Sequence, residues 1–182
     1  KSSNGLKYLM ATKPFQVGIR DNNVTCFNSN TVSIDEKFEI ILRNLNKYSS
    51  NFLNKINLKY IVLCEKLSIA GINSAGVPNH EMKTLIIDIK FDNNYFERVI
   101  HHEVFHIINE SFKNYFKESD WKSYNNAQFK YAECSTCSDR LDLSTIKETN
   151  GFLTEYSMST AAEDMAEIFS FLMTEKNSIK IK

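Results

Sequence analysis

The sequence predicts an α+β domain in which a small mixed sheet packs against an internal helix and a C-terminal helix. Two short runs of mainly branched apolar residues, 60–64 and 84–89, are typical of β-strands. The second run leads directly into a segment with helical spacing at about 94–110, and a further helix is expected at about 160–176. Strands followed directly by a helix favour a layered arrangement of sheet and helix.

The length and composition are those of one globular domain spanning residues 1–182. Hydrophobic residues make up 42% of the chain, and no internal repeat or Gly/Ser-rich linker marks a second domain. The 22 basic and 22 acidic side chains give a net charge of zero, so nothing favours a nucleic acid or an anionic membrane as partner. No apolar run is long enough to cross a bilayer, and we therefore expect no membrane insertion.

The cysteine content bears on the compartment. Cys26, Cys64, Cys134 and Cys137 are too few for a disulfide-built scaffold, but their even number allows an oxidising compartment. The first residues, 1–5, look like the remainder left after removal of a signal or an upstream domain. We expect a secreted or exported bacterial protein, with a cytoplasmic location as the alternative.

The N-terminal half is expected to supply the sheet and one helix. Residues 1–35 are predicted to be an irregular N-terminal segment with a short β-like piece at 15–19. An amphipathic helix then runs from Asp35, because apolar residues recur at helical spacing as far as Phe52. A second strand is expected at 68–72, after the run at 60–64.

The next segment connects the sheet to the internal helix. Residues 73–79 have the composition of a loop. We expect Asn94 to be the N-cap of the following helix, with Glu97 three positions later in a capping-box-like arrangement. The apolar residues of this helix are expected to pack against the sheet: Phe96, Val99, Ile100, Val104, Ile107 and Ile108.

The C-terminal half is expected to contain one long irregular segment and one helix. Residues 111–150 are polar and aromatic, which predicts a long ordered excursion from the fold. The inner face of the final helix is expected at six positions: Ala162, Met165, Ala166, Phe169, Leu172 and Met173.

The most informative motif lies in the internal helix. Residues 101–106 read His-His-Glu-Val-Phe-His and contain H-E-x-x-H at 102–106. On a helix, His102 and His106 lie on one face, where both imidazoles can bind one Zn²⁺. Glu103 is rotated around the helix and can contact a water at the metal without binding the metal. The pattern indicates a zinc hydrolase, and a buried helix with polar residues around a small cavity is the simpler alternative.

A catalytic zinc site requires a third protein ligand, and the final helix supplies the candidates. Glu163 and Glu167 share one helix face, whereas Asp164 is turned aside. Thr160 and Glu163 also fit a capping box, in which Glu163 would only close the start of the helix, and Glu167 fits an ordinary exposed position. The residue types and spacing alone leave these alternatives open.

The end of the chain resembles a known group of zinc peptidases. Leu-Thr-Glu-Tyr at 153–156, separated by six residues from Glu-Asp-Met-Ala-Glu at 163–167, is similar to the end of the anthrax lethal factor catalytic domain and of the bacterial Pro-Pro endopeptidases. It is also similar to a wider set of bacterial zinc metallopeptidases. The resemblance covers the helix at 94–109 and the segment 151–173, and it implies a zincin-like metallopeptidase fold. Asp-Met at 164–165 replaces an aromatic pair of lethal factor, and substrate preference does not carry over.

The resemblance implies a metal site of the gluzincin type. His102, His106 and Glu163 would bind one Zn²⁺ ion, and Glu103 would be the general base. The chain would then be a zinc-dependent endopeptidase that acts on a protein or peptide substrate.

The resemblance also implies roles around the metal. Tyr156 would support the oxyanion, and Glu167 would accept the free N–H of a ligand histidine. The strand at 84–89, or its neighbour, is expected to bind extended peptide by β-augmentation.

The cysteines of the excursion allow a different site. Cys134 and Cys137 have the spacing of half a zinc site or of a redox pair, although a disulfide or two free thiols is the simpler interpretation. Together with His102 and His106 they could form a closed Cys2His2 site. Two alternative functions follow: a non-catalytic, metal-stabilised binding domain, and a metallohydrolase that acts on a non-peptide amide.

Four other polar residues are expected to have structural roles. His101 precedes the motif and points away from the face of the two ligand candidates. His80 is expected on the polar surface, and Tyr124 and Tyr131 are expected to pack within the excursion; for all three, a position at the cleft is the alternative.

Overall fold

The fold is built around one long strand in a mixed sheet, and the predicted α+β class is confirmed. The computed structural model describes residues 2–19, 22–29, 34–139, 142 and 151–174. The strands are β1 (Lys7–Met10), β2 (Phe15–Ile19), β3 (Asn22–Phe27), β4 (Tyr60–Ile69), β5 (Ile72–Asn73), β6 (Gly76–Asn79) and β7 (Thr84–Asp88). The helices are α1 (Ile34–Leu45), α2 (Ser50–Lys55), α3 (Asn93–Ser111), α4 (Glu118–Lys122) and α5 (Ala161–Thr174), with short 3-10 turns η2 (Ser135–Cys137) and η3 (Tyr156–Met158).

β4 is central because its two halves pair with different strands. The order in the sheet is β2-β3-β4-β7-β6, and β1 and β5 also pair with β4. The first half of β4 is parallel to β1 and β7, and its second half is antiparallel to β3 and β5. β6 pairs antiparallel with β7 at the end of this order, so its outer edge has no strand partner among the described residues.

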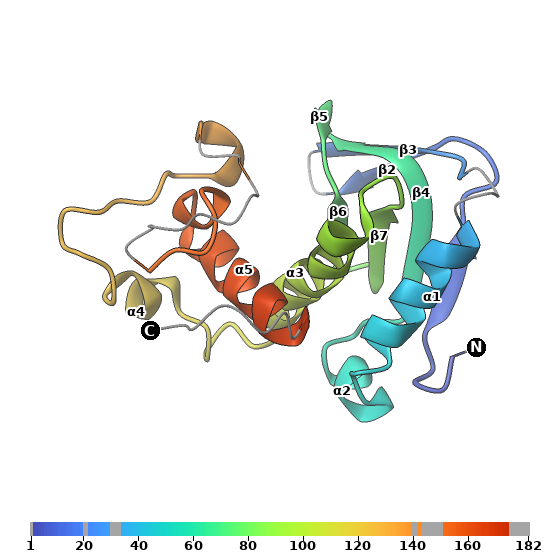
Figure 1. Cartoon of the computed structure of the whole chain (residues 1–182), viewed down its shortest axis with the longest axis horizontal. Helices are drawn as coiled ribbons and strands as arrows, with labels where there is room; N and C mark the ends of the chain where they lie inside the picture. Colours follow the sequence, from blue (N-terminus) through green and yellow to red (C-terminus); the bar gives the residue numbers. More distant parts are fainter. Residues whose placement is uncertain (1, 20–21, 30–33, 140–141, 143–150, 175–182) are drawn as a thin grey trace.

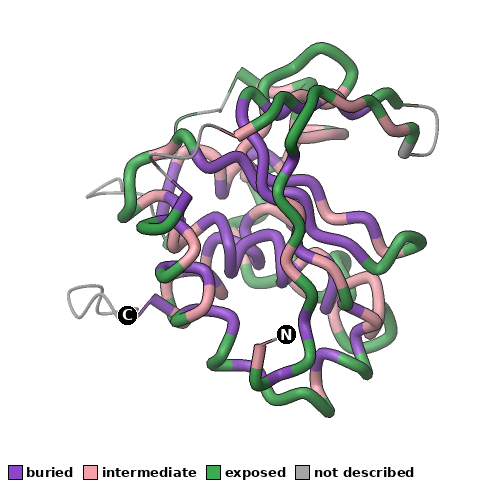
Figure 2. The backbone as a smooth tube through the Cα atoms, turned by 90° about the vertical axis from the view of Figure 1, so that its right-hand side faces the viewer, coloured by how far each residue is buried: buried purple, intermediate pink, exposed green. Residues whose placement is uncertain are grey.

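Alternate side chains of the central strands enter two separate cores, as the pleat requires. Ile61 of β4 and Leu85 and Ile87 of β7 face the main core, which α1, α2 and α3 close. Ile86 and Val77 belong to a second cluster that includes residues of β3. Figure 2 shows the buried positions running through the inner strands and helices, whereas many connections are exposed, as is most of β1.

α3 is buried on two sides because it lies between the sheet and α5 (Figure 1). Its predicted apolar face is confirmed, since all six residues are buried: Phe96, Val99, Ile100, Val104, Ile107 and Ile108. On the side toward α5, Phe105 packs against Met165 and Ala166. These two α5 residues lie on the predicted inner face, but the prediction is wrong for Leu172, which is 59% exposed.

The N-terminal segment is more regular than predicted. Instead of remaining irregular, it contains the three strands β1, β2 and β3: β2 pairs with β3, and β1 and β3 pair with β4. The expected helix from Asp35 to Phe52 is wrong, because it is divided into α1 and α2, and Ser49 caps the second of these through a hydrogen bond from the Phe52 amide.

Three further boundaries differ from the prediction. The expected strands at 60–64 and 68–72 form one continuous strand as far as Ile69. The expected loop at 73–79 contains β6. The N-cap of α3 is Asp92 rather than Asn94, since the Asp92 carboxylate accepts hydrogen bonds from two backbone amides of the first turn.

The predicted capping box of α3 is also wrong. Glu97 does not reach back to the helix start, because its carboxylate pairs with Arg43 of α1. α3 is therefore joined to α1 by an ion pair at its exposed edge, in addition to the apolar contacts of the main core.

Side-chain contacts hold the excursion against α5. The indole of Trp121 and the phenol of Tyr131 both donate hydrogen bonds to Asp164 Oδ2, at 2.8 and 2.7 Å. Tyr131 also packs against Phe129, as expected of a residue within the excursion, whereas Tyr124 is 84% exposed. Part of the predicted excursion, 140–141 and 143–150, lies outside the described residues.

The four cysteines form two disulfides. Cys26 and Cys64 are joined between β3 and β4, and Cys134 and Cys137 are joined across η2. Disulfides persist in oxidising compartments. Among the described helices, none is long and apolar enough to cross a membrane.

Candidate metal centre

Two helices bring three potential metal ligands together. His102 and His106 project from α3, and their Nε2 atoms lie 3.1 Å apart. Glu163 lies in the first turn of α5, with its Oε2 atom 2.9 Å from His102 Nε2 and 3.2 Å from His106 Nε2. The ligand atoms all lie within 4.8 Å of one another, and the described residues contain no other such group. This group could hold a metal ion.

The chemistry of these donors fits zinc. Two imidazole nitrogens and one carboxylate oxygen form a donor set used by catalytic Zn²⁺, which keeps a further position open. Burial alone would raise the pKa of Glu163, but His106 and His102 outweigh this effect and hold the pKa below its usual range. The carboxylate is therefore ionised and available as a ligand.

The electrostatics around His102 favour a positive charge. Burial alone would lower the pKa of His102, but the hydrogen bonds and charges of Glu163 and Glu167 raise it well above its usual range. A cation bound at Nε2 would take the place of the proton there, because it would interact with the same Glu163 carboxylate.

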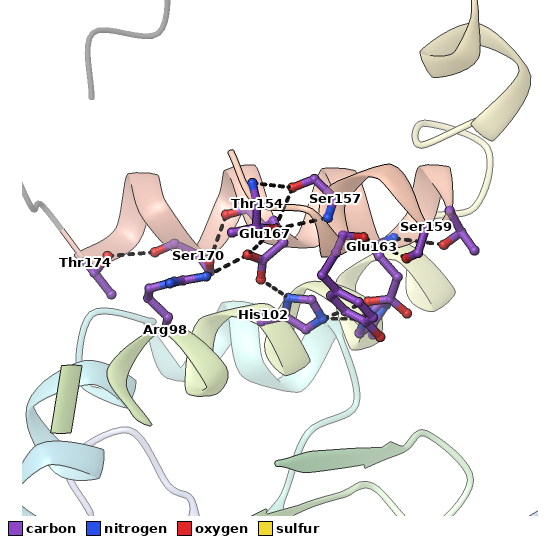
Figure 3. Close-up of polar contacts among 12 residues, drawn as sticks. Arg98, His102, Thr154, Ser157, Ser159, Glu163, Glu167, Ser170 and Thr174 are labelled. Atoms are coloured by element: carbon purple, nitrogen blue, oxygen red, sulfur yellow. Dashed lines mark hydrogen bonds and ion pairs between the residues drawn. The ribbon is translucent and has the colours of Figure 1, made fainter. Parts of the chain in front are cut away.

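Glu167 contacts His102 from the side opposite Glu163 (Figure 3). The Nδ1 atom of His102 lies 2.9 Å from Glu167 Oε1. The other oxygen of Glu167 accepts hydrogen bonds from Arg98 at 2.6 Å and from the Thr154 hydroxyl at 3.0 Å. A carboxylate that accepts the Nδ1 proton leaves the lone pair on Nε2, the atom that faces Glu163.

Arg98 and Thr154 were not predicted as part of this centre. A signal for Arg98 was present, since it lies four residues before His102 and therefore on the same helix face. Thr154 precedes α5 in sequence, and its contact with Glu167 depends on how the η3 turn folds back, which no local pattern reveals.

The two interpretations of Glu163 are compatible in the structure. The Glu163 backbone amide donates a hydrogen bond to the Thr160 hydroxyl at 3.2 Å, which is one half of a capping box. The Glu163 carboxylate does not complete the box but points to the two histidines. Backbone capping thus places the side chain at the metal centre.

Glu103 is buried between α3 and the edge strand. It is 9% exposed and lines the same cleft as the two histidines. A Cβ atom at Gly76 of β6 would lie 2.8 Å from Glu103 Cδ, so only glycine leaves room for this carboxyl group. Burial raises the pKa of Glu103, and His102 and His106 oppose this shift. Gly76 was not recognised from the sequence.

Tyr156 lies across the cleft on η3. Its ring centroid is 6.1 Å from that of His102, and Tyr156 lines the same cleft as Glu163. Burial, Glu163 and Glu103 raise the pKa of the phenol far above its usual range. The group is therefore neutral and can act as a hydrogen-bond donor.

The centre lies in a cleft of about 810 Å³. One wall is formed by β6 and its flanking residues, from Asn73 to Glu81. The other wall includes Ser135, Thr136 and Tyr156, and residues of α3 also line the cleft.

His101 does not face the cleft. Its ring is fully buried, with Tyr48 OH 2.6 Å from Nδ1 and Asn44 Oδ1 3.0 Å from Nε2. Burial, together with the nearby Lys47 charge, lowers the pKa of His101 to about 3. The expected structural role is confirmed, since the neutral ring donates to Asn44 and accepts from Tyr48.

His80 and the excursion cysteines both lie outside the group of three potential ligands. His80 lines the cleft, which is the alternative to its expected surface position, and its Nε2 atom is 3.3 Å from the Ser111 hydroxyl. Cys134 and Cys137 are joined as a disulfide and provide no thiolate for a metal. The Cys2His2 alternative is therefore wrong for this structure.

Comparison with known proteins gives one match. A model of the family described as "Putative zinc-binding metallo-peptidase" matches residues 76–180, which is more than half of the chain. No curated protein and no solved structure gives a significant match. The matched range begins at Gly76 and includes the histidines of α3 and the carboxylates of α5. The chain belongs to this family of zinc-binding metallo-peptidases.

Proposed function

We propose that the chain is a zinc-dependent endopeptidase with a gluzincin-type centre. His102, His106 and Glu163 hold one Zn²⁺, and Glu167 orients His102 through the Nδ1 proton. The convergence of the three donor atoms at the bottom of a cleft, with Glu103 beside them, is the observation that supports this most strongly. The similarity of segment 151–173 to the lethal factor and Pro-Pro endopeptidase group supports the same assignment.

The proposed reaction is hydrolysis of a peptide bond by water. Bound Zn²⁺ supplies a Lewis acid that polarises the scissile carbonyl and acidifies the attacking water. Glu103 takes the proton of this water and passes it to the leaving amine, and burial shifts its pKa in the direction that suits a base near neutral pH. The neutral Tyr156 phenol donates a hydrogen bond to the oxyanion that develops on the carbonyl oxygen.

The open edge of β6 is the proposed binding surface for the substrate backbone. The expected strand at 84–89 is β7, which lies between β4 and β6 and has both edges paired. Its neighbour β6 borders the cleft with an unpaired edge, within the described part of the sheet. An extended peptide can add to this edge by backbone hydrogen bonds, which favours protein and peptide substrates.

Removal of the metal tests the proposed function. We expect a zinc chelator to lower the rate of peptide-library cleavage by at least about 10³-fold, because the Lewis acid contributes several kcal/mol to the barrier. Addition of one equivalent of Zn²⁺ should restore the rate, as measured by mass spectrometry of the digested library.

Two outcomes would contradict the proposal. A folded, zinc-loaded protein that cleaves no peptide in a broad library is not an endopeptidase. Cleavage of cell-wall fragments by that same preparation would then identify a hydrolase of a non-peptide amide, and failure on both substrates would identify a binding domain.

The contact between β6 and Glu103 gives a second expected result. Gly76→Ala places a methyl group where the Glu103 side chain lies, so the carboxylate must move away from its position. We expect kcat to fall by about 10²-fold, the size of effect that a displacement of about 1 Å produces at a reacting centre. The measurement is steady-state cleavage of a peptide substrate at saturating zinc.

Gly18→Ala is the matched control. A Cβ atom at Gly18 of β2 would meet nothing within 4 Å, and this glycine does not line the cleft. Equal kcat values for Gly76→Ala and Gly18→Ala would show that catalysis does not require the Glu103 carboxylate in its observed position.

A further inference from the structure

The metal centre belongs to a longer line of side-chain contacts between α3 and α5. Residues spaced four apart on each helix meet in reverse order, so that the two helices run antiparallel along this line. From one end to the other, Arg98, His102 and His106 of α3 face Phe171, Glu167 and Glu163 of α5. The end at Arg98 and Phe171 contains no potential metal donor, so its contribution to the centre is indirect.

The Glu167 carboxylate is shared between two residues of α3. Its Oε1 atom lies 2.9 Å from His102 Nδ1, and its Oε2 atom accepts a hydrogen bond from Arg98 Nη2 at 2.6 Å. Arg98 and His102 are one helical turn apart, so their polar groups reach the two oxygens of one carboxylate (Figure 3). A rotation of the carboxylate that breaks one of these contacts also disturbs the other.

The guanidinium of Arg98 is itself held in place by α5. Its Cζ atom lies 4.1 Å from the centroid of the Phe171 ring, one helical turn beyond Glu167. A planar guanidinium can stack on an aromatic ring and donate to a carboxylate at the same time. The side chains of Arg98 and Glu167 are only 12% and 3% exposed, so water competes little for this ion pair.

Thr154 brings a third segment of the chain to the same carboxylate. The Ser157 backbone amide donates a hydrogen bond to Thr154 Oγ1 at 3.0 Å, and the Thr154 hydroxyl donates its proton to Glu167 Oε2, also at 3.0 Å. Thr154 is fully buried, and Ser157 lies in η3 next to Tyr156. Glu167 of α5 is therefore fixed by donors from α3 and from the start of η3.

We propose that Arg98 and Thr154 are positioning residues for the metal centre. Together they hold Glu167 Oε2, so that Oε1 stays directed at His102 Nδ1 and the opposite nitrogen, Nε2, stays directed at the metal. Neither residue contacts the metal or supplies a donor atom to it. The inference rests on the zinc site of the proposed function, but it does not depend on the cleavage reaction.

The sign of one substitution separates positioning from simple charge repulsion. We expect Arg98→Met to lower zinc affinity by about three- to tenfold, less than the 10–100-fold typical of a direct partner of a ligand. If Arg98 acted only through its positive charge, its removal would raise zinc affinity, because like charges repel. Competition between the full-length chain and a chromophoric chelator measures the affinity. An unchanged or higher affinity would overturn the role of Arg98.

A double-mutant cycle tests whether Arg98 acts through Glu167. In a Glu167→Gln background, Arg98→Met should cause no further loss of zinc affinity, because the charged group that it holds is already absent. Equal losses in the wild-type and Glu167→Gln backgrounds would mean that Arg98 acts by another route, and this part of the proposal would be rejected.

Thr154 allows a test without any change of charge. Thr154→Val keeps the shape of the side chain and removes the hydroxyl, and we expect it to lower zinc affinity by about threefold, since a neutral donor contributes less than a guanidinium. Thr154→Ser keeps the hydroxyl and should bind zinc as the wild type does. An equal loss in both Thr154 variants would show that the hydroxyl is not the group that matters.

Arg43→Met is the matched control for Arg98→Met. Arg43 also pairs with a glutamate of α3, Glu97, but its side chain is 63% exposed and does not line the cleft. We expect its zinc affinity to equal that of the wild type. The melting temperature of each metal-free variant reports whether the fold is intact.

A spectroscopic readout reports the orientation of His102 directly. In the zinc-loaded protein, the Nδ1 proton of His102 should give a proton NMR signal that exchanges slowly with water, because a buried carboxylate accepts it. A change of this signal in Glu167→Gln assigns it. We expect Arg98→Met and Thr154→Val to speed its exchange, and wild-type exchange in both variants would contradict the proposal.

The failures of the two proposals are distinguishable. If zinc-loaded wild type cleaves no peptide but Arg98→Met and Thr154→Val lower zinc affinity as expected, the proposed reaction fails and this inference stands. If wild type cleaves peptide and both variants bind zinc as tightly as wild type, only this inference is overturned. If wild type binds no zinc, both fail.

Discussion

Glu103→Gln is expected to retain zinc and to lower kcat by about 10²–10⁴-fold, the usual contribution of a positioned general base. Glutamine has nearly the same shape as glutamate, so it fits the space beside Gly76 without displacing β6. The amide cannot accept the proton of the attacking water. The test is kcat on a peptide substrate together with zinc content by elemental analysis, because the proposal requires that activity falls while the metal stays.

Glu97→Gln on the same helix is the control for this substitution. Glu97 pairs with Arg43 and does not line the cleft. Loss of such a surface ion pair costs at most about 1 kcal/mol of stability and should leave kcat unchanged. Glu103→Gln with more than a tenth of wild-type kcat would mean that Glu103 is not the base.

Glu163→Ala is expected to have the largest effect on metal affinity. Loss of a residue that only orients a metal ligand lowers metal affinity by about 10–100-fold. Glu163→Ala removes one of the three donors themselves, so its zinc affinity should fall by more than that. Glu167→Gln should fall within that smaller range, because Glu167 contacts the ring nitrogen of His102 that faces away from Glu163. Competition with a chromophoric chelator measures both affinities in the same assay.

The relative order of these two variants decides between the carboxylates. If Glu167→Gln loses the metal while Glu163→Ala retains it, the assignment of the third ligand is reversed. Loss of zinc in the paired Cys134→Ser and Cys137→Ser variant, with retention in Glu163→Ala, would instead favour a cysteine-containing site and exclude the proposed enzyme.

Local sequence patterns were sufficient to predict the helix that carries the His-Glu-x-x-His motif and its buried face. The apolar spacing of α3 predicted which residues are buried, since one face of a helix must meet the sheet. Its start was misplaced by two residues because Asp92 and Asn94 are both good capping residues. The choice is made by the Asp92 carboxylate, which reaches the amides of Asn94 and Tyr95 at 3.1 Å.

Non-local pairing explains why the sheet was predicted less well. β1 to β3 are short and partly polar, and they are stabilised as strands by pairing with each other and with β4, far along the chain. In β4 itself, Glu65 and Lys66 interrupt the apolar run that predicted the first strand, although Glu65 is 7% exposed in the structure. A local sequence pattern does not show which other strands will pair with these residues, and that pairing is what makes them part of a strand.

The candidate site was predictable where residues repeat at helical spacing and less so where two helices meet. His102 and His106 share a face by spacing alone. The position of Glu163 depends on the packing of α5 against α3 and on the Thr160 cap: its backbone amide takes part in the cap, and its carboxylate points to the two histidines. Gly76 has a role only because β6 lies against Glu103, so the sequence around it gives no indication of that role.

The separation between His106 and Glu163, 57 residues along the chain, has an evolutionary consequence. The excursion between them supplies one wall of the cleft but none of the three metal donors. Doubling the length of a flexible loop costs only about 0.6 kcal/mol of closure entropy. Insertions at exposed positions that leave the Trp121 and Tyr131 hydrogen bonds to Asp164 intact can therefore accumulate with little thermodynamic penalty, and they can reshape the cleft wall without altering the three donor residues.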